Sequence, residues 1–370
     1  MKKILAILFA LTMLLCLTAC GGDNVKEKDK DTNGTTAAAK SEAEGSTTTG
    51  GSSVSESTTA PTEGTTTTTT ESEATTTVPT TVTTATEGTE STATTTTTTA
   101  PTTTTTQKPK NPGNVPKSIK ILSVGNSFSV DAMKNHLYPM LEEAGCTDIH
   151  LGILYIGGAS VDTHYDNVRL DRAKYEYYEN VNGEWVVTPD YKASTAFALT
   201  DWDIVTLQQV SGHSGRGISL NNLQALIDLV RPQIGEAKMY WHMTWAYQQG
   251  ASHSDFGYYN NDQSRMYKSI VRVISEKIVT NEAFVGYFPA GTAIQNLRTS
   301  SLGDTLTADG YHLSDTYGDY TAALTWFCYL TGADAETVTY RPASIASHFD
   351  EIAQAVNNAI KTPLAITECE

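Results

Sequence analysis

Three residues of the types that hydrolases use for nucleophilic catalysis occur at two distant places in the chain. Ser127 follows a short apolar run, 119–124, and Asp309 stands three residues before His312 near the other end. A serine between a strand and a helix has its N–H in the positive field of the helix N-terminus, which stabilises an oxyanion. An aspartate at this spacing can orient the imidazole that accepts the serine proton. Ser127 alone could merely cap a helix, but the three together predict a catalytic triad.

The segments that would position these residues alternate between strands and helices. We expect strands at 119–124, 149–156, 204–207, 237–243 and 284–287, a hairpin at 175–187, and helices at 130–144, 220–230, 264–279, 314–330 and 344–360. This alternation predicts an α/β fold of three layers, α/β/α, with a mostly parallel central sheet. Because ligands bind beyond the carboxyl ends of such strands, the site should lie in the segments that follow them.

Three segments of the region from roughly 118 to 332 resemble the sequence blocks of the SGNH (GDSL-like) hydrolases, more closely an uncharacterised bacterial lipoprotein branch. They are Gly125-Asn126-Ser127-Phe128-Ser129, Gly157-Gly158-Ala159-Ser160 and Asp309-Gly310-Tyr311-His312. The resemblance implies a flavodoxin-like fold without a cofactor. It also implies Ser127 as nucleophile, His312 as base, Asp309 as its partner, and N–H groups of Ser127 and Gly158 in the oxyanion hole. Asn126 departs from the family, which commonly has Asp there.

The third block also departs from the family, which usually has Gly-x-Asn with the Asn as an oxyanion donor. This chain has Gln208-Gln209 after its third strand. A glutamine amide can donate the same hydrogen bond, so Gln209 is the predicted third donor and Gln208 the alternative. Both glutamines could instead be structural, which would leave the hole with two donors.

Aromatic residues gather after the fourth predicted strand. Trp241, His242 and Trp245 are the candidates for contact with a sugar ring, since aromatic side chains beside a catalytic edge suit stacking on sugars. The alternative is that some of them belong to the core, because alternate residues of a strand point inward. His213, His242 and His253 lack the carboxylate spacing of a metal site, and no metal is predicted.

The N-terminal region predicts export and lipid anchoring. Residues 1–19 have the basic start and short apolar stretch of a signal peptide, and Leu17-Thr18-Ala19-Cys20 resembles the bacterial lipobox, in which the cysteine is lipidated. Residues 20–116 are rich in Thr and too poor in apolar residues to fold, so we expect a disordered stalk. Residues 117–370 form the predicted folded domain. Membrane contact would be through the lipid on Cys20, at the extracytoplasmic face of the cell membrane.

Charge and cysteine content narrow the function classes. The formal net charge of −16 argues against a nucleic-acid partner. Once Cys16 is removed with the leader and Cys20 is lipidated, three cysteines remain, an odd number that allows no complete disulfide framework.

The sequence therefore predicts a lipid-anchored serine esterase that removes O-acetyl or other short acyl groups from carbohydrates or polysaccharides. One alternative is a surface carbohydrate-binding or adhesion module that has lost catalysis, suggested by the departures at Asn126 and in the third block. Another is a lipase or thioesterase that acts on longer acyl chains.

Overall fold

The computed structural model describes residues 111–370 of the chain. The predicted signal peptide, Cys20 and the Thr-rich tract up to residue 110 lie outside the described residues. Within residues 111–370, no helix is long and apolar enough to cross a membrane.

Residues 111–116, predicted as the end of the stalk, are attached to the folded domain. Asn111 and Asn114 donate hydrogen bonds to the backbone carbonyls of 331–332 at 2.7 and 2.8 Å. The predicted domain start at Lys117 is therefore a few residues too late. A segment of turn-forming residues shows no periodicity, so its backbone hydrogen bonds leave no pattern in the sequence.

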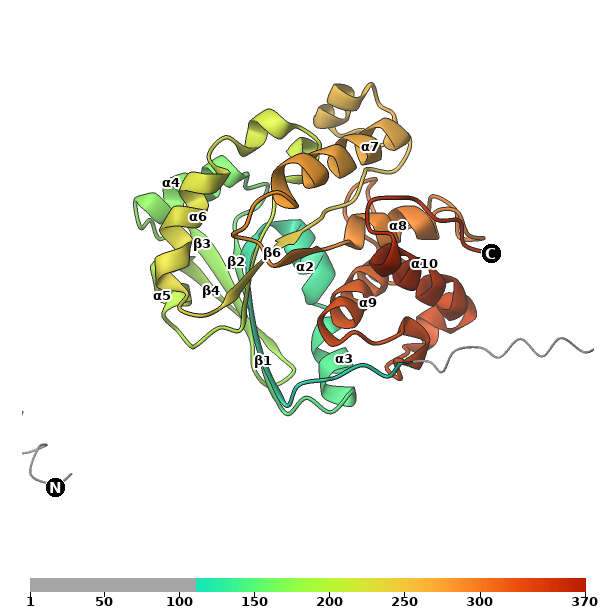
Figure 1. The fold of residues 1–370 in the computed structure, drawn as a ribbon, viewed down its shortest axis with the longest axis horizontal. Coiled ribbons are helices and arrows are strands. Elements are labelled where there is room, and N and C mark those ends of the chain that lie inside the picture. Colours follow the sequence, from blue (N-terminus) through green and yellow to red (C-terminus); the bar gives the residue numbers. More distant parts are fainter. Residues whose placement is uncertain (1–110) are drawn as a thin grey trace, which may run out of the picture. The chain divides into compact units, whose positions relative to one another are not determined.

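A seven-stranded sheet of order β4-β3-β2-β1-β5-β6-β7 forms the middle layer (Figure 1). Its strands are β1 (Ser118–Gly125), β2 (Asp148–Tyr155), β3 (Tyr175–Asn180), β4 (Trp185–Tyr191), β5 (Ile204–Leu207), β6 (Lys238–His242) and β7 (Gly286–Phe288). The strands β2, β1, β5, β6 and β7 lie side by side in this order, and each pairs in parallel with the next. The β3–β4 hairpin extends the sheet beyond β2, and both of its strands pair antiparallel with their neighbours. The predicted mostly parallel sheet is confirmed, with β1 at its centre.

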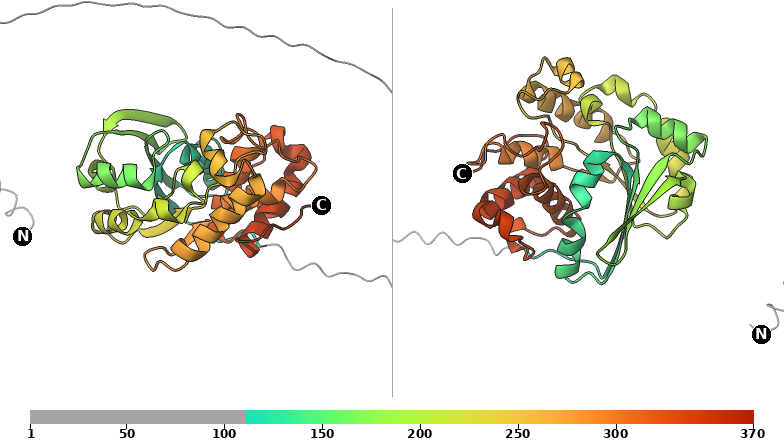
Figure 2. Two further views of the ribbon diagram at one scale, coloured as in Figure 1. Left: turned by 90° about the horizontal axis from the view of Figure 1, so that it is seen from above. Right: turned by 180° about the vertical axis from the view of Figure 1, so that it is seen from behind.

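Helices cover both faces of this sheet (Figures 1 and 2). One face carries α2 (Ser127–Met133), α3 (Leu137–Glu143), α8 (Ala290–Leu297), α9 (Tyr317–Thr331) and α10 (Phe349–Lys361). The other carries α4 (Val161–Arg169), α5 (Ala193–Phe197) and α6 (Leu223–Val230), and α7 (Gln263–Val273) lies between β6 and β7 in the chain. All four residues of β5 are buried, as expected for a strand covered on both sides. The predicted three-layer architecture is confirmed.

The single helix predicted at 130–144 is two helices, α2 and α3. Pro139 lies in the first turn of α3, where a missing N–H costs nothing. In a continuous helix its ring would press against the carbonyl of Asn135, four residues earlier. The break therefore falls at 134–136, and it brings the Asn135 side chain to the start of α9, where it donates to Asp319 Oδ2 at 2.7 Å.

Candidate active site

The three predicted triad residues meet at the carboxyl end of the central strand. Ser127 is the first residue of α2, two residues beyond the end of β1. His312 Nε2 lies 2.8 Å from Ser127 Oγ, and His312 Nδ1 lies 2.7 Å from Asp309 Oδ2. With its proton on Nδ1, the imidazole donates to Asp309 and accepts from the serine hydroxyl. This is the arrangement of a serine nucleophile with its base and orienting carboxylate; the catalytic roles themselves stay predictions.

The Asp309–His312 segment is a tight turn closed by its own carboxylate. Asp309 Oδ1 accepts the backbone N–H groups of Tyr311 and His312 at 3.1 and 2.8 Å. Gly310 between them has a φ of +98°, a conformation that side chains with a Cβ rarely adopt. Burial raises the pKa of Asp309, but the hydrogen bonds from His312 and Tyr311 outweigh it and hold this pKa below its ordinary value. Asp309 is therefore ionised at neutral pH.

Trp245, predicted to contact a sugar, instead supports the triad from inside the core. Its side chain is fully buried and stacks on Phe128 of α2, with ring centroids 4.3 Å apart. Its Nε1–H donates to the carbonyl of Tyr311 at 2.8 Å. Trp245 thus contacts both the nucleophile helix and the turn that carries His312, and it cannot reach a substrate.

Trp241 and His242 are also buried, so the predicted sugar contacts of all three residues are wrong. Trp241 packs edge-on against Phe284, and His242 Nδ1 accepts the Trp326 Nε1–H at 2.9 Å. Burial lowers the pKa of His242 to about 3, so it is neutral. For Trp241 and His242 the physical reason is that β6 lies between two helical layers, so successive side chains enter the core on either face.

The Gln209 amide is fully engaged within the protein, which contradicts its predicted role in the oxyanion hole. Its Nε2 donates to the backbone carbonyl and the hydroxyl of Ser219 at 2.7 and 3.1 Å. Its Oε1 accepts the N–H groups of Val161 and Val210 at 3.0 and 2.8 Å. An amide has two N–H bonds, and both are used here. Gln209 fastens the loop after β5 to the start of α4.

Gln208, the alternative donor, lies beneath the nucleophile turn. Its Oε1 accepts the Ser129 hydroxyl at 2.5 Å, and its Nε2 donates to Asn126 Oδ1 at 2.6 Å. A Cβ on Gly125 would come within 2.2 Å of Ser129 Oγ and 2.9 Å of Gln208, so only glycine fits above this pair. The structural alternative for both glutamines is the one that the contacts favour.

Asn126, the departure from the GDS pattern, uses both ends of its amide. Its Oδ1 accepts the Phe128 N–H at 3.1 Å and so caps α2, and its Nδ2 donates to the Ala159 carbonyl at 3.0 Å. The second bond ties the nucleophile turn to the turn after β2 that contains Gly158. An ionised aspartate could cap the helix but could not donate to Ala159.

We expect Asn126→Asp to lower the free energy of unfolding by about 1–3 kcal/mol at pH 7, because it places a carboxylate against the buried Ala159 carbonyl. A protonated aspartate can donate, so the loss should shrink as the pH falls toward 4. Urea unfolding of variant and wild type at both pH values measures this. A loss that is the same at both pH values would contradict the assigned donor role.

Gly158, the predicted second oxyanion donor, lies on the exposed turn between β2 and α4. Its φ is +63°, and a Cβ there would meet no atom within 4 Å. The glycine is therefore required by its backbone conformation rather than by a neighbour, and its surroundings leave room for a ligand. The turn is held beside Ser127 through the bond from Asn126 to Ala159.

Comparison with known proteins places the domain in a family. Residues 120–360 match the model of a family described as a domain of unknown function, DUF4886. The chain belongs to the DUF4886 family. A crystal structure of a DUF4886 family protein from Bacteroides uniformis is 38% identical, with a TM-score of 0.65, and the match covers 68% of this chain and 98% of that one. Among curated proteins there is no match.

Two further solved structures resemble this DUF4886 chain more distantly. A putative SGNH hydrolase from Slackia heliotrinireducens is 19% identical, with a TM-score of 0.35 over 56% of this chain and 97% of that one. A putative GDSL-like lipase from Parabacteroides merdae is 15% identical, with a TM-score of 0.40, and the match covers 60% of this chain and 99% of that one. In this chain the three blocks named from the sequence lie together at the carboxyl edge of the sheet.

A carboxylate that the sequence analysis did not single out reaches the triad of this DUF4886 domain. Asp131 lies one turn after Ser127 on α2, and its Oδ2 accepts the Leu313 N–H at 3.0 Å. Helix α2 therefore holds the segment 312–313 through two hydrogen bonds, from Ser127 to His312 and from Leu313 to Asp131. Burial raises the pKa of Asp131 to about 6, although the Leu313 hydrogen bond and the nearby His312 oppose the rise. The i, i+4 spacing from Ser127 is the signal that could have found it.

A second carboxylate, Asp319, lies near Asp131, in the first turn of α9. Its Oδ2 accepts from Asn135, while its Oδ1 is buried and has no hydrogen-bond partner among the described residues. Burial and the charge of Asp131 raise the pKa of Asp319 to about 8. At neutral pH Asp319 is therefore mostly a neutral acid, and Asp131 is the ionised member of the two.

We expect Asp131→Asn to lower kcat/KM for a short ester about tenfold, or roughly 1.4 kcal/mol. An ionised Asp131 favours the imidazolium that forms on His312, and asparagine keeps the acceptor for Leu313 but not the charge. Because the pKa of Asp131 is about 6, its charge is present at pH 7 and is lost as the pH falls through 6. The acid limb of the wild-type pH profile should therefore contain the protonation of Asp131, and that of the variant should lack it. Identical acid limbs would exclude this contribution.

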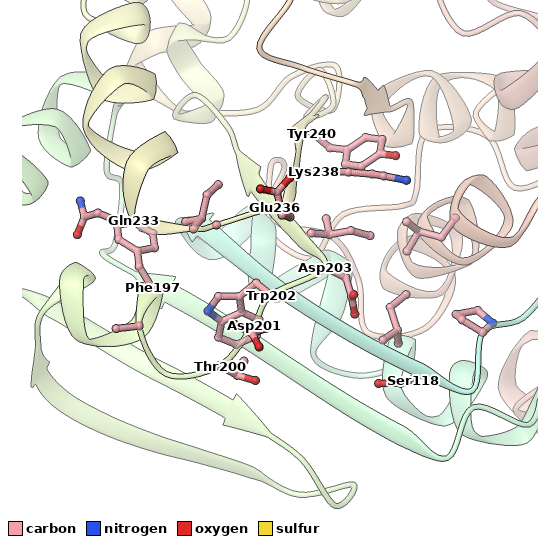
Figure 3. A pocket seen from close by; sticks show the side chains of 17 residues that line it. Ser118, Phe197, Thr200, Asp201, Trp202, Asp203, Gln233, Glu236, Lys238 and Tyr240 are labelled. Atoms are coloured by element: carbon pink, nitrogen blue, oxygen red, sulfur yellow. The ribbon is translucent and has the colours of Figure 1, made fainter.

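A large hollow lies at the opposite edge of the sheet, where the parallel strands begin. It has a volume of about 950 Å³ and is lined by the amino-terminal ends of β1, β5 and β6, with Ser118, Asp203 and Lys238 around it (Figure 3). No histidine or cysteine lines it. We place the candidate chemistry at Ser127 because the hydrogen-bonded nucleophile and base are there, and size alone does not make a catalytic site.

Proposed function

We propose that this DUF4886 domain is a serine ester hydrolase of the SGNH type. The observation that carries the proposal is the chain of two short hydrogen bonds from Ser127 through His312 to Asp309. A helix cap alone would not require a histidine and an aspartate in this order on its hydroxyl.

In the proposed mechanism Ser127 Oγ attacks the ester carbonyl while its proton passes to His312 Nε2. The oxyanion accepts hydrogen bonds from the N–H groups of Ser127, at the first position of α2, and Gly158. The carbon–oxygen bond to the alcohol breaks, and His312 returns the proton to that alcohol. Water then attacks the acyl-serine with His312 again as base, which releases the acid and restores the serine. Asp309 holds the imidazole throughout.

We propose short acyl groups on carbohydrates, acetyl first, as the substrate class. Ser127 and His312 are partly exposed, and Gly157 and Gly158 beside them are exposed. An open site admits a bulky polymer and needs little enclosure for a small acyl group, whereas a long acyl chain needs an apolar pocket.

Both proposals, ester hydrolysis and a short acyl group on a carbohydrate, are tested by assaying the full chain with p-nitrophenyl acetate, p-nitrophenyl palmitate and acetylated xylan. We expect turnover of the acetate and release of acetic acid from the polymer. Failure on every ester would end the esterase proposal in favour of the binding module, and a preference for palmitate would favour the lipase alternative.

We also propose that Cys20 carries the lipid anchor and that the protein lies at the extracytoplasmic face of the bacterial membrane. The support is the order of the leader residues 1–19 and Cys20 in the sequence. Wild type should partition with membranes, and Cys20→Ala should not. Equal detergent partitioning of both forms, with no lipid on the N-terminal peptide, would refute the anchor.

A further inference from the structure

A second hollow, of about 640 Å³, lies beside α7 (Figure 1 shows this helix). Its walls come from the loop that follows β5, from the segment Ser254–Tyr259 after β6, from α7, and from the π-helical segment Ile274–Ile278 that continues α7. Two of these segments follow the carboxyl ends of strands, as Ser127 does. The hollow is therefore built from the connections that follow β5 and β6 and from the helical stretch that leads to β7.

Cations gather in this hollow although the chain as a whole is strongly acidic, with a net charge of −16. Arg216, Arg272 and Lys277 line it, and Arg265 and Lys268 line an adjoining hollow that shares Arg272. Of these five side chains, only Arg272 has an acidic partner in the described part of the chain, Glu276 at 3.6 Å. Positive side chains that lie close together without acidic partners favour the binding of an anionic ligand.

An exposed aromatic ring lies among these cations. Tyr258 is 57% exposed, and the guanidinium of Arg216 lies 3.6 Å from the centre of its ring. This contact holds Arg216 in place, while within residues 111–370 its side chain donates no hydrogen bond. A guanidinium fixed in this way presents its N–H groups as a fork that fits a carboxylate.

We propose that this hollow binds the acidic sugar units of a polysaccharide, with Arg216 and Lys277 on a uronate carboxylate and the sugar ring against Tyr258. Its volume falls in the range of ligand pockets, roughly 300–1,000 Å³. A neutral glycan gives no reason for the cations, and an anionic lipid headgroup gives none for the exposed ring. The proposal deepens the proposed function, on which it rests for the role of the polymer as substrate. The binding itself requires no ester hydrolysis.

Affinity electrophoresis of the full chain in gels containing polygalacturonate, or the neutral polymer hydroxyethyl cellulose, tests the site. We expect polygalacturonate alone to retard the wild type, and 0.5 M salt to remove most of the effect by screening. Arg216→Gln combined with Lys277→Gln should weaken binding at least tenfold, and Tyr258→Ala severalfold. Arg169→Gln is the matched control, because Arg169 also lies over a tyrosine, Tyr165, but is paired with Asp166.

Equal retardation by both polymers, no retardation, or the same loss in Arg169→Gln would overturn the proposal. Tighter, Arg216-dependent binding to phosphatidylglycerol vesicles than to polygalacturonate would assign the hollow to lipid instead. The Arg216 and Lys277 variants should hydrolyse p-nitrophenyl acetate at the wild-type rate. If wild type does not hydrolyse that ester, the proposed function fails, and the gel result still decides the binding site.

Discussion

Ser127→Ala is expected to lower kcat for p-nitrophenyl acetate by a factor on the order of 10³ to 10⁶ with the fold intact. Alanine removes the oxygen that lies 2.8 Å from His312 Nε2, and within residues 111–370 no other hydroxyl is hydrogen-bonded to that nitrogen. His312→Ala should have an effect of similar size, because the serine then has no base. Stopped assays with purified protein measure the activity, and circular dichroism shows whether each variant is folded.

The double variant separates a catalytic unit from two independent contributions. Ser127→Ala with His312→Ala should be about as slow as either single variant, since nucleophile and base act together. Asp309→Asn should cost the same or less, because Asp309 orients the ring and exchanges no proton. A serine-directed phosphonate should label Ser127 only. Full activity in Ser127→Ala, with label on Ser129 or Ser160, would make Ser127 a helix cap.

Trp245→Ala is expected to lower the free energy of unfolding by about 3–5 kcal/mol. The substitution removes a fully buried ring that stacks on Phe128 and donates to the Tyr311 carbonyl. Because those two contacts hold opposite sides of the triad, kcat should fall as well, even at temperatures where the variant is folded. Urea unfolding and assays well below the melting temperature measure the two effects.

Trp245→Phe is the matched control, because it keeps an aromatic ring for Phe128 while it loses the hydrogen bond to Tyr311 and a smaller part of the buried ring. We expect a smaller stability loss, about 1–3 kcal/mol. If Trp245→Ala unfolds at the wild-type urea concentration, or if it binds acetylated xylan less tightly with kcat unchanged, the buried supporting role would be wrong.

The parts that sequence alone predicted are those set by local order along the chain. A serine just beyond a buried strand, and an Asp-x-x-His turn before a helix, occupy fixed places in an α/β sheet. The fold class follows from the alternation of strand and helix, and the helix break just before Pro139 could have been predicted from the same sequence rules.

The parts that sequence could not predict depend on which side a residue faces once both helical layers have packed. Trp241 and Trp245 are equally compatible with a core and with a sugar platform until burial is known. Gln209 has the chemistry of an oxyanion donor, and only the position of Ser219 shows that its amide is occupied. Asp131 lies beside the triad because the segment before α9 places Leu313, the residue after His312, against α2, a contact between residues 182 positions apart.

The Ser127 side chain and its base are separated by 185 residues. While the ribosome is still making the chain, the serine is already translated and has no histidine to activate it. We therefore expect the proposed hydrolysis to begin only after the segment with Asp309 and His312 has been made and has docked, and a shorter nascent chain to be inactive. The same separation makes ester turnover a sensitive test of intact molecules. A single protease cut between β7 and Asp309, followed by loss of the C-terminal piece, should remove the proposed activity, although Ser127 and all seven strands of the sheet stay in one fragment.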